Sequence, residues 1–171
     1  LKKALSNSEM LKTEFKSSLD ESEKGKIELE PFVFAHQNFP LDQTSYDSIP
    51  KSVINLNEKF KNFYINKYKG RELTLIYQGS LVELKIQLPA MRNRTYTITC
   101  DLLCATLITS LSLPKKFSEI TEIFGQDKIA KRVCSKLHKK KVILKNPAVK
   151  SFEDSDVFTL NPKFSHDRPN I

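Results

Sequence analysis

Glycine and long apolar runs are both scarce in this sequence of 171 residues, and each scarcity excludes a class of protein. Four glycines leave little material for the glycine-rich loops that hold phosphate groups, and no serine lies in the G-x-S-x-G pattern of a nucleophile elbow. The longest apolar stretch, residues 102–113, contains threonine and serine and falls short of the roughly 20 residues that cross a bilayer. We therefore expect neither a phosphate-loop enzyme, nor a serine hydrolase, nor a contact with membranes.

Cysteine and histidine are also sparse, with three of each. The cysteines are Cys100, Cys104 and Cys134, an odd number without a C-x-x-C pair, and the histidines are scattered. Disulfide frameworks and zinc sites both need more closely grouped ligands, so we expect no metal and no cofactor. Free cysteines among apolar neighbours are typical of a protein core and of a reducing compartment, which predicts a location in the nucleus and cytoplasm.

Positive charge is plentiful, but it is confined to one region. The chain has 28 basic against 20 acidic residues, a net charge of +8. Residues 126–150 hold nine of the basic residues and a single acid, Asp127, so this region alone accounts for the net charge. A local field of this kind attracts polyanions or an acidic protein surface.

The first part of the chain, residues 1–95, predicts helices packed on a small sheet. Apolar residues recur every three or four positions over residues 1–19 and 53–69, which predicts two amphipathic helices, the second ending near Gly70. Phe32 and Phe34 fall on one side of an extended segment after Pro31.

A hairpin is predicted over residues 71–88. Two segments that alternate in polarity flank the turn Gln78-Gly79-Ser80. The candidate inward-facing residues are Leu73, Leu75 and Tyr77 on the first strand, and Val82, Leu84 and Ile86 on the second.

Residues 96–171 have the element order of a winged-helix domain. A short strand at 96–100 precedes three helices, and two further strands follow at 142–144 and 157–160. The predicted N-caps of the helices are Asp101, Ser118 and Asp127. The fold class expected for the whole chain is α+β, an α/β sheet domain followed by a winged helix whose third helix holds the recognition position.

The third helix bears a basic patch that consists of Lys131, Arg132, Lys136, Lys139 and Lys140. On a winged helix these residues could contact DNA phosphates, which makes a nucleic-acid-binding protein the main alternative hypothesis. A solvated face, or one that meets an acidic protein, fits them equally well. A third hypothesis is a thioester-forming enzyme with Cys134 as nucleophile, but this cysteine falls on the apolar face of the predicted helix, where a thiol is not activated.

Residues 58–85 contain a pattern of higher specificity. It consists of Glu58, Phe60, Phe63, Tyr64, Lys67, Gly70, Arg71, Leu73 and Thr74, followed by Leu84 and Lys85. This pattern resembles the cullin homology region, in which a helix ends in a Phe-Tyr pair and is followed by a Gly-Arg junction and a strand pair that closes on Leu-Lys. A second set is similar to the closing strands of the cullin winged helix: Lys145, Pro147, Asp156, Phe158, Asn161 and Phe164. The resemblance covers roughly residues 8–171.

The departures from the family pattern are informative as well. Ile76 and Tyr77 stand where cullins usually have Trp-His, and residues 101–111 lack the usual Gln-Met. We therefore expect a divergent member of the family, from a fungus. Cullins continue past this point with the rest of a return strand and a second winged helix, where a lysine accepts a ubiquitin-like modifier. We therefore expect the chain to be a fragment of a longer protein.

The resemblance implies a non-catalytic scaffold of a ubiquitin ligase. Its sheet would accept a strand from a RING-finger subunit of the Rbx type, and its winged helix would help to position a ubiquitin-conjugating enzyme. The residues implied for the RING-binding sheet are Phe32, Phe34, Leu73, Leu75, Tyr77, Val82, Leu84 and Ile86. Substrate adaptors would bind the N-terminal half of the longer protein. Since a sheet edge left without its partner promotes aggregation, we expect the chain alone to be poorly soluble.

Overall fold

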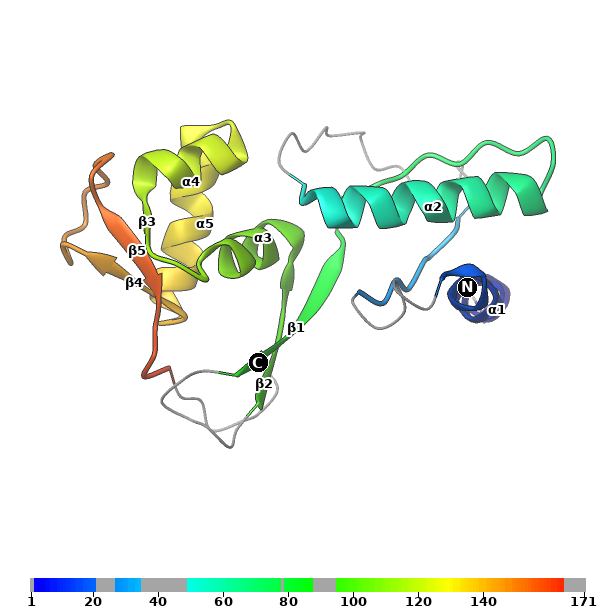
Figure 1. Cartoon of the computed structure of the whole chain (residues 1–171), viewed down its shortest axis with the longest axis horizontal. Coiled ribbons are helices and arrows are strands. Elements are labelled where there is room, and N and C mark those ends of the chain that lie inside the picture. The colour runs from blue at the N-terminus through cyan, green and yellow to red at the C-terminus, as the bar shows by residue number, and fades with distance from the viewer. Residues whose placement is uncertain (1, 21–26, 35–48, 78, 88–94, 165–171) are drawn as a thin grey trace. The chain divides into compact units, whose positions relative to one another are not determined.

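The computed structural model describes residues 2–20, 27–34, 49–77, 79–87 and 95–164, with residues 2–7 as backbone only. The chain forms two compact units (Figure 1). The first comprises Leu1–Thr44 and Pro50–Gln78, and the second comprises Ser45–Ile49 and Gly79–Ile171. The sequence had suggested a division between residues 95 and 96. The units instead divide beside Gly79, because the strand that follows it pairs with a later part of the chain.

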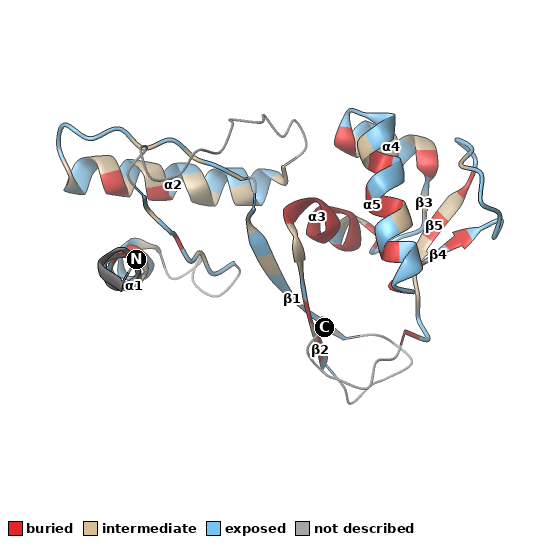
Figure 2. Cartoon of the chain, turned by 180° about the vertical axis from the view of Figure 1, so that it is seen from behind, coloured by how far each residue is buried: buried red, intermediate tan, exposed pale blue. Residues whose placement is uncertain are grey.

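Two helices, α1 (Lys2–Ser18) and α2 (Lys51–Lys67), build the first unit, as their apolar periodicity predicts. The helices share a core of Leu11, Phe15, Phe60 and Tyr64, each at most 6% exposed. The rings of Phe15 and Phe60 meet edge to face at 5.2 Å. Burial of four side chains of this size contributes roughly 6–12 kcal/mol before the entropy of ordering is subtracted. Figure 2 shows these buried positions on α2 as red bands between exposed turns.

The chain leaves α2 through a junction that fixes the next segment. Gly70 adopts a φ of +83°, which a residue with a Cβ rarely tolerates. Arg71 then donates a hydrogen bond from Nη1 to the Tyr64 hydroxyl at 3.4 Å, and its guanidinium lies 4.8 Å from the centre of the Tyr68 ring. Residues 72–77 therefore run back along the helix, with Leu73 packed against its core (Figure 1).

The second unit begins with a two-stranded antiparallel sheet of β1 (Leu81–Gln87) and β2 (Thr95–Asp101). The hairpin predicted over residues 71–88 is wrong in this respect, since residues 71–77 form no strand and β1 pairs with β2 instead. The ladder between β1 and β2 has seven register pairs, which is longer than the predicted pairing of β1 with residues 73–77. The first residues of β2 are all β-branched or aromatic, which favours the strand conformation. The ladder also places Leu84 opposite Ile98, two residues that face the core.

The rest of the second unit is a winged helix, as predicted. Its helices are α3 (Leu102–Ser110), α4 (Phe117–Phe124) and α5 (Asp127–Lys139). Its strands are β3 (Lys115–Lys116), β4 (Ile143–Asn146) and β5 (Val157–Leu160), which form an antiparallel sheet in the order β3-β5-β4. With the α1 and α2 unit, this confirms the α+β fold class.

The helix ends differ slightly from their predictions. Asp101 caps α3 as expected, and its Oδ1 accepts a hydrogen bond from the Cys104 N–H at 2.8 Å. Ser118 and Asp127 lie inside the first turns of α4 and α5 rather than at the caps. In α4 the Glu119 carboxylate accepts from the Lys116 N–H at 2.6 Å, so the helix starts two residues earlier than it would with a Ser118 cap.

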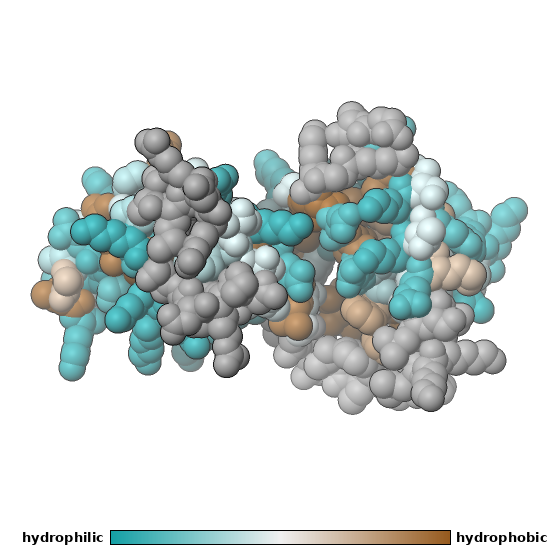
Figure 3. All heavy atoms as spheres, turned by 90° about the horizontal axis from the view of Figure 1, so that it is seen from below, coloured by the Kyte–Doolittle hydropathy of each residue, from teal (hydrophilic) through white to brown (hydrophobic). Residues whose placement is uncertain are grey.

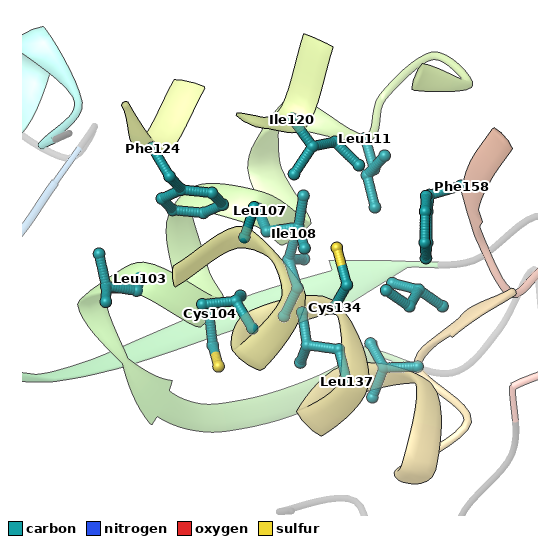
Figure 4. Close-up of a cluster of buried hydrophobic side chains, with 14 of the residues drawn as sticks. Leu103, Cys104, Leu107, Ile108, Leu111, Ile120, Phe124, Cys134, Leu137 and Phe158 are labelled. Atoms are coloured by element: carbon teal, nitrogen blue, oxygen red, sulfur yellow. The ribbon is translucent and has the colours of Figure 1, made fainter. Parts of the chain in front are cut away.

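The core of the second unit lies between the three helices and the small sheet (Figure 4). Residues of α3, α4 and α5 converge there. The most deeply buried hydrophobic residues, all 0% exposed, are Leu107, Ile120, Ala130, Cys134, Ile143 and Phe158. The sheet of β1 and β2 joins this core through Ile98, with Leu84 and Ile86 packed partly against it. Among the described residues, no helix has the length and apolar character needed to cross a membrane.

Candidate partner-binding surfaces

The first candidate surface is strand β1. Burial alternates along its whole length, so that Val82, Leu84 and Ile86 are half-buried while the residues between them are exposed. The sheet contains only β1 and β2 within the described part of the chain. In the described chain β1 is paired with β2 along one edge only, so a third strand added to its other edge would satisfy the backbone groups directed there.

Residues 73–77 show the same alternation without a ladder. Leu73, Leu75 and Tyr77 are half-buried and the residues between them exposed, which is the pattern predicted, but no strand of the described chain pairs with them. Phe32 and Phe34 lie on the outward side of their segment, 59% and 41% exposed, while Pro31 is buried. Figure 3 shows brown apolar side chains still visible on the first unit, in the right half of the view.

The eight residues predicted for the RING-binding sheet thus occupy three segments in two units. Phe32, Phe34, Leu73, Leu75 and Tyr77 belong to the first unit, and Val82, Leu84 and Ile86 to the second. The structure joins only the last three in a ladder. One exposed apolar residue of β1 lies outside the predicted set: Leu81, which begins the strand and is 75% exposed. Alternation assigns it to the same face as the polar Glu83 and Lys85, so the sequence pattern did not single it out.

The second candidate surface is the exposed side of α5. The five residues of the predicted basic patch, Lys131, Arg132, Lys136, Lys139 and Lys140, are all exposed. Two of them are paired with acids: Lys131 contacts Asp127 at 2.8 Å, and Lys136 contacts Asp101 at 2.6 Å. The patch as predicted also omits Lys128, which lies one helical turn before Arg132.

Asp101 links α5 to α3. Burial acts to raise the pKa of its carboxyl, but hydrogen bonds from Lys136 and from the backbone and thiol of Cys104 outweigh it, so the pKa is lowered. The carboxylate therefore stays ionised, holding the Lys136 ammonium with one oxygen and capping α3 with the other. Lys136 is in this way occupied within the fold.

The cysteines have the properties of core residues. Cys134 is 0% exposed, and burial raises the pKa of its thiol to about 12. Burial likewise raises the pKa of Cys104 to about 12 and that of the half-buried Cys100 to about 11. A thioester-forming nucleophile needs an accessible thiol with a lowered pKa, so Cys134 does not meet the requirement. No group of three or more His, Cys, Asp or Glu side chains in the described residues could hold a metal ion.

The motif residues of the wing form an internal network. Lys145 and Asp156 make an ion pair of 2.7 Å in which both side chains are at most 2% exposed. The Lys145 ammonium also donates to the carbonyls of Pro147 and Val149 at 3.0 and 3.2 Å. Asp156 accepts from the Glu153 N–H at 2.8 Å, so both charges are well provided with partners. Lys145 thus holds the wing in shape and, unlike the exposed lysines of α5, is not available to a partner.

The other motif residues are also used within the fold. Phe158 is fully buried, and Phe164 meets the Tyr96 ring at 5.7 Å. The Asn161 side chain donates to the Lys141 carbonyl at 2.8 Å, which ties the end of β5 to the turn after α5. The second set of motif residues therefore reflects contacts that set the fold.

Comparison with known proteins agrees with this architecture. Residues 33–164 match the model of the cullin alpha+beta domain. The chain is 24% identical over 177 aligned residues to Cullin-1 of Dictyostelium discoideum, covering 98% of this chain and 23% of that protein. It is 25% identical over 151 residues to Cullin-4A of Mus musculus, covering 86% of this chain and 20% of that protein.

The chain therefore spans about a fifth to a quarter of the length of these relatives. The family match includes α2, the strand pair and the whole winged helix, with both sets of motif residues. The two relatives lie in distant lineages and agree on the same family. This chain belongs to the cullin family, and it contains the family's alpha+beta domain.

Proposed function

We propose that the chain is the part of a cullin scaffold that receives a RING-finger subunit, and that it does so by adding a strand of that subunit to its own incomplete sheet. The observation that supports this most directly is β1, a seven-residue strand with regular alternation in a sheet of two strands. In strand addition, backbone hydrogen bonds give affinity and alternate side chains fix the register. The half-exposed faces of Val82, Leu84 and Ile86 offer such a register.

The exposed segments of the first unit extend the same proposal. Residues 73–77 have the burial pattern of a strand but no ladder in the described chain, and Phe32 and Phe34 expose aromatic surface. An added strand would satisfy the backbone groups of such a segment and cover apolar area at the same time. Phe32, Phe34, Leu73, Leu75 and Tyr77 therefore remain in the proposed binding set.

The chemistry of ubiquitin transfer would then belong to the ubiquitin-conjugating enzyme that the RING subunit recruits, with the winged helix bracing the arrangement. The buried Cys134, with its raised pKa, is not suited to form a thioester with ubiquitin in this chain. Substrate adaptors would bind elsewhere in the longer protein, which would work in the nucleus and cytoplasm.

Two leucines allow a matched test of the strand proposal. Leu81 on β1 is 75% exposed and Leu113, between α3 and β3, is 71% exposed, so neither contributes much to the core. We expect Leu81→Asp to weaken co-purification of a RING-finger subunit at least tenfold, because aspartate disfavours the strand conformation and removes the apolar side chain that would pack beside a side chain of the added strand. Leu113→Asp should bind as the wild type does. Equal binding by both variants would refute docking at β1.

A further inference from the structure

The exposed side of α5 contains a row of cations that the scaffold role does not use. Lys128, Arg132 and Lys139 occupy positions i, i+4 and i+11 of the helix, with Ser135 between the last two at i+7. At 3.6 residues per turn these positions lie within an arc of about 60° and span about 16 Å along the axis. We call Lys128, Arg132 and Lys139 the basic stripe. The buried residues Ala130, Val133, Cys134 and Leu137 lie on the opposite side of the helix.

The nearby acids are already occupied, which leaves the basic stripe unneutralised. Asp127 pairs with Lys131 on one flank of the stripe, and Asp101 pairs with Lys136 on the other. In the part of the chain that the structure describes, no acid forms an ion pair with a residue of the stripe. The exposed Lys140 and Lys141 extend the positive field beyond the end of the helix.

The position of α5 in the fold is suited to insertion into the major groove of duplex DNA. It is the third helix of the winged helix, followed directly by the strands β4 and β5 of the wing. Figure 2 shows exposed residues, in pale blue, along α5. A helix with side chains is about 10–12 Å wide and the major groove of duplex DNA about 12 Å, so a third helix of this kind can enter it. The wing is less suited than α5 to contact an anionic groove, because the acidic residues Glu153 and Asp154 are exposed there.

The composition of the stripe favours phosphates over a protein surface. Lysine is depleted in protein interfaces, whose centres are apolar and aromatic, whereas lysine and arginine dominate contacts to nucleic-acid backbones. Among the residues of the second unit that the structure describes, the exposed large apolar side chains are Leu81, Leu113, Leu144 and Val149, and none of them lies on α5. A partner that binds the basic stripe would therefore contact charged side chains and no large apolar side chain of α5.

We propose that the basic stripe of α5 binds the backbone phosphates of duplex nucleic acid, without sequence specificity. This activity is separate from RING docking, which uses β1, so either proposal can fail while the other stands. Contact with three phosphates gives a slope of about −3 for the logarithm of the association constant against the logarithm of salt concentration. Binding should therefore weaken about 40-fold between 50 and 200 mM salt.

Fluorescence anisotropy with a labelled 20-base-pair DNA duplex tests this directly on the 171-residue chain. The triple variant Lys128→Ala/Arg132→Ala/Lys139→Ala should bind at least tenfold more weakly at 50 mM salt, with a slope reduced by about 2–3. The matched control is Lys51→Ala/Lys69→Ala/Lys163→Ala, which removes the same charge at exposed positions off α5. The control should change the slope by less than about 1.

Three results would overturn the proposal. The first is absence of salt-dependent binding to the duplex by the wild-type chain. The second is an equal loss of affinity in the control variant, which would reduce the effect to net charge alone. The third is equally tight binding to a 20-residue polyglutamate, which would assign the stripe to an acidic protein partner. Circular dichroism of both variants checks that the helix content is unchanged.

Discussion

Replacing Lys145 by methionine tests the network that holds the wing. The substitution keeps most of the side-chain volume but removes the ammonium that pairs with Asp156 and donates to two carbonyls. Because the lysine side chain is 2% exposed, water cannot replace it without opening the wing. Loss of one partner from a buried pair costs about 3–5 kcal/mol, and we expect Lys145→Met to lower the free energy of unfolding by that amount.

Urea denaturation followed by circular dichroism measures the effect. With a denaturant slope of about 2 kcal/mol per molar, the midpoint should fall by roughly 1.5–2.5 M. Lys139→Met is the control, since Lys139 is exposed and forms no ion pair among the described residues; it should stay within about 0.5 kcal/mol of the wild type. If Lys145→Met lowers the free energy of unfolding by less than about 1 kcal/mol, water reaches the ion pair in solution, and the pair is not the buried interaction described above.

The pH dependence of the same variant has a distinctive sign. In the wild type, the hydrogen bond from Lys145 lowers the pKa of Asp156, so this stabilisation is present at neutral pH and is lost as the pH falls through the lowered pKa. In Lys145→Met the carboxylate is buried without its cation, which raises its pKa. Protonation of Asp156 then stabilises the folded variant. The difference in the free energy of unfolding between wild type and variant should therefore become smaller as the pH is lowered from 7 to 5. A constant gap would contradict an uncompensated carboxylate in the variant.

Three further results are expected from single substitutions or labelling. Lys141 has a φ of +59°, so Lys141→Gly should raise the free energy of unfolding by up to about 1 kcal/mol in urea denaturation, whereas Lys141→Ala, which keeps the Cβ, should not. Asp101→Ala should lower it by about 1–2 kcal/mol because α3 loses its cap, and Asp101→Asn should recover part of the loss; equal effects of the two would exclude capping as the cause. Iodoacetamide at pH 8 should modify Cys100 before Cys104 and Cys134, which are at most 1% exposed, as followed by peptide mass spectrometry; early labelling of Cys134 would reopen the thioester hypothesis.

The sequence predicted the helices well because each has a clear apolar period and a recognisable end. Residues 51–67 place Phe60 and Tyr64 on one face, and α5 places Val133, Cys134 and Leu137 on another. The order of three helices and closing strands, which defines the winged helix, followed from the same signals. Such local patterns are visible without knowledge of the fold.

Strand pairing was the main error, because it depends on competition between distant segments. Residues 73–77 and 81–87 both alternate, and their proximity favoured a hairpin, but 95–101 provides the longer ladder for β1. The outward position of Phe32 could not be predicted from the sequence either, because it follows from the burial of Pro31 on the other side of the segment. Alternation predicts two faces but not which of them meets the core.

Ion pairs explain why the basic patch was defined imperfectly. Lysines close together in sequence look alike, yet Lys136 is bound to Asp101, 35 residues away, and Lys145 is buried against Asp156. Lys128, which was left out, remains exposed in the basic stripe. Which cations are available to a partner is thus decided by the tertiary positions of the acids.

Hydrogen exchange of the β1 amides tests the central proposal most directly. In the chain alone, alternate amides of Leu81–Gln87 face the β2 ladder and should be protected, while those directed to the outer edge should exchange rapidly. With a RING-finger subunit bound, we expect the rapidly exchanging amides to slow at least tenfold, because the added strand accepts their hydrogen bonds. Binding of the subunit with unchanged exchange along β1 would place the docking site elsewhere.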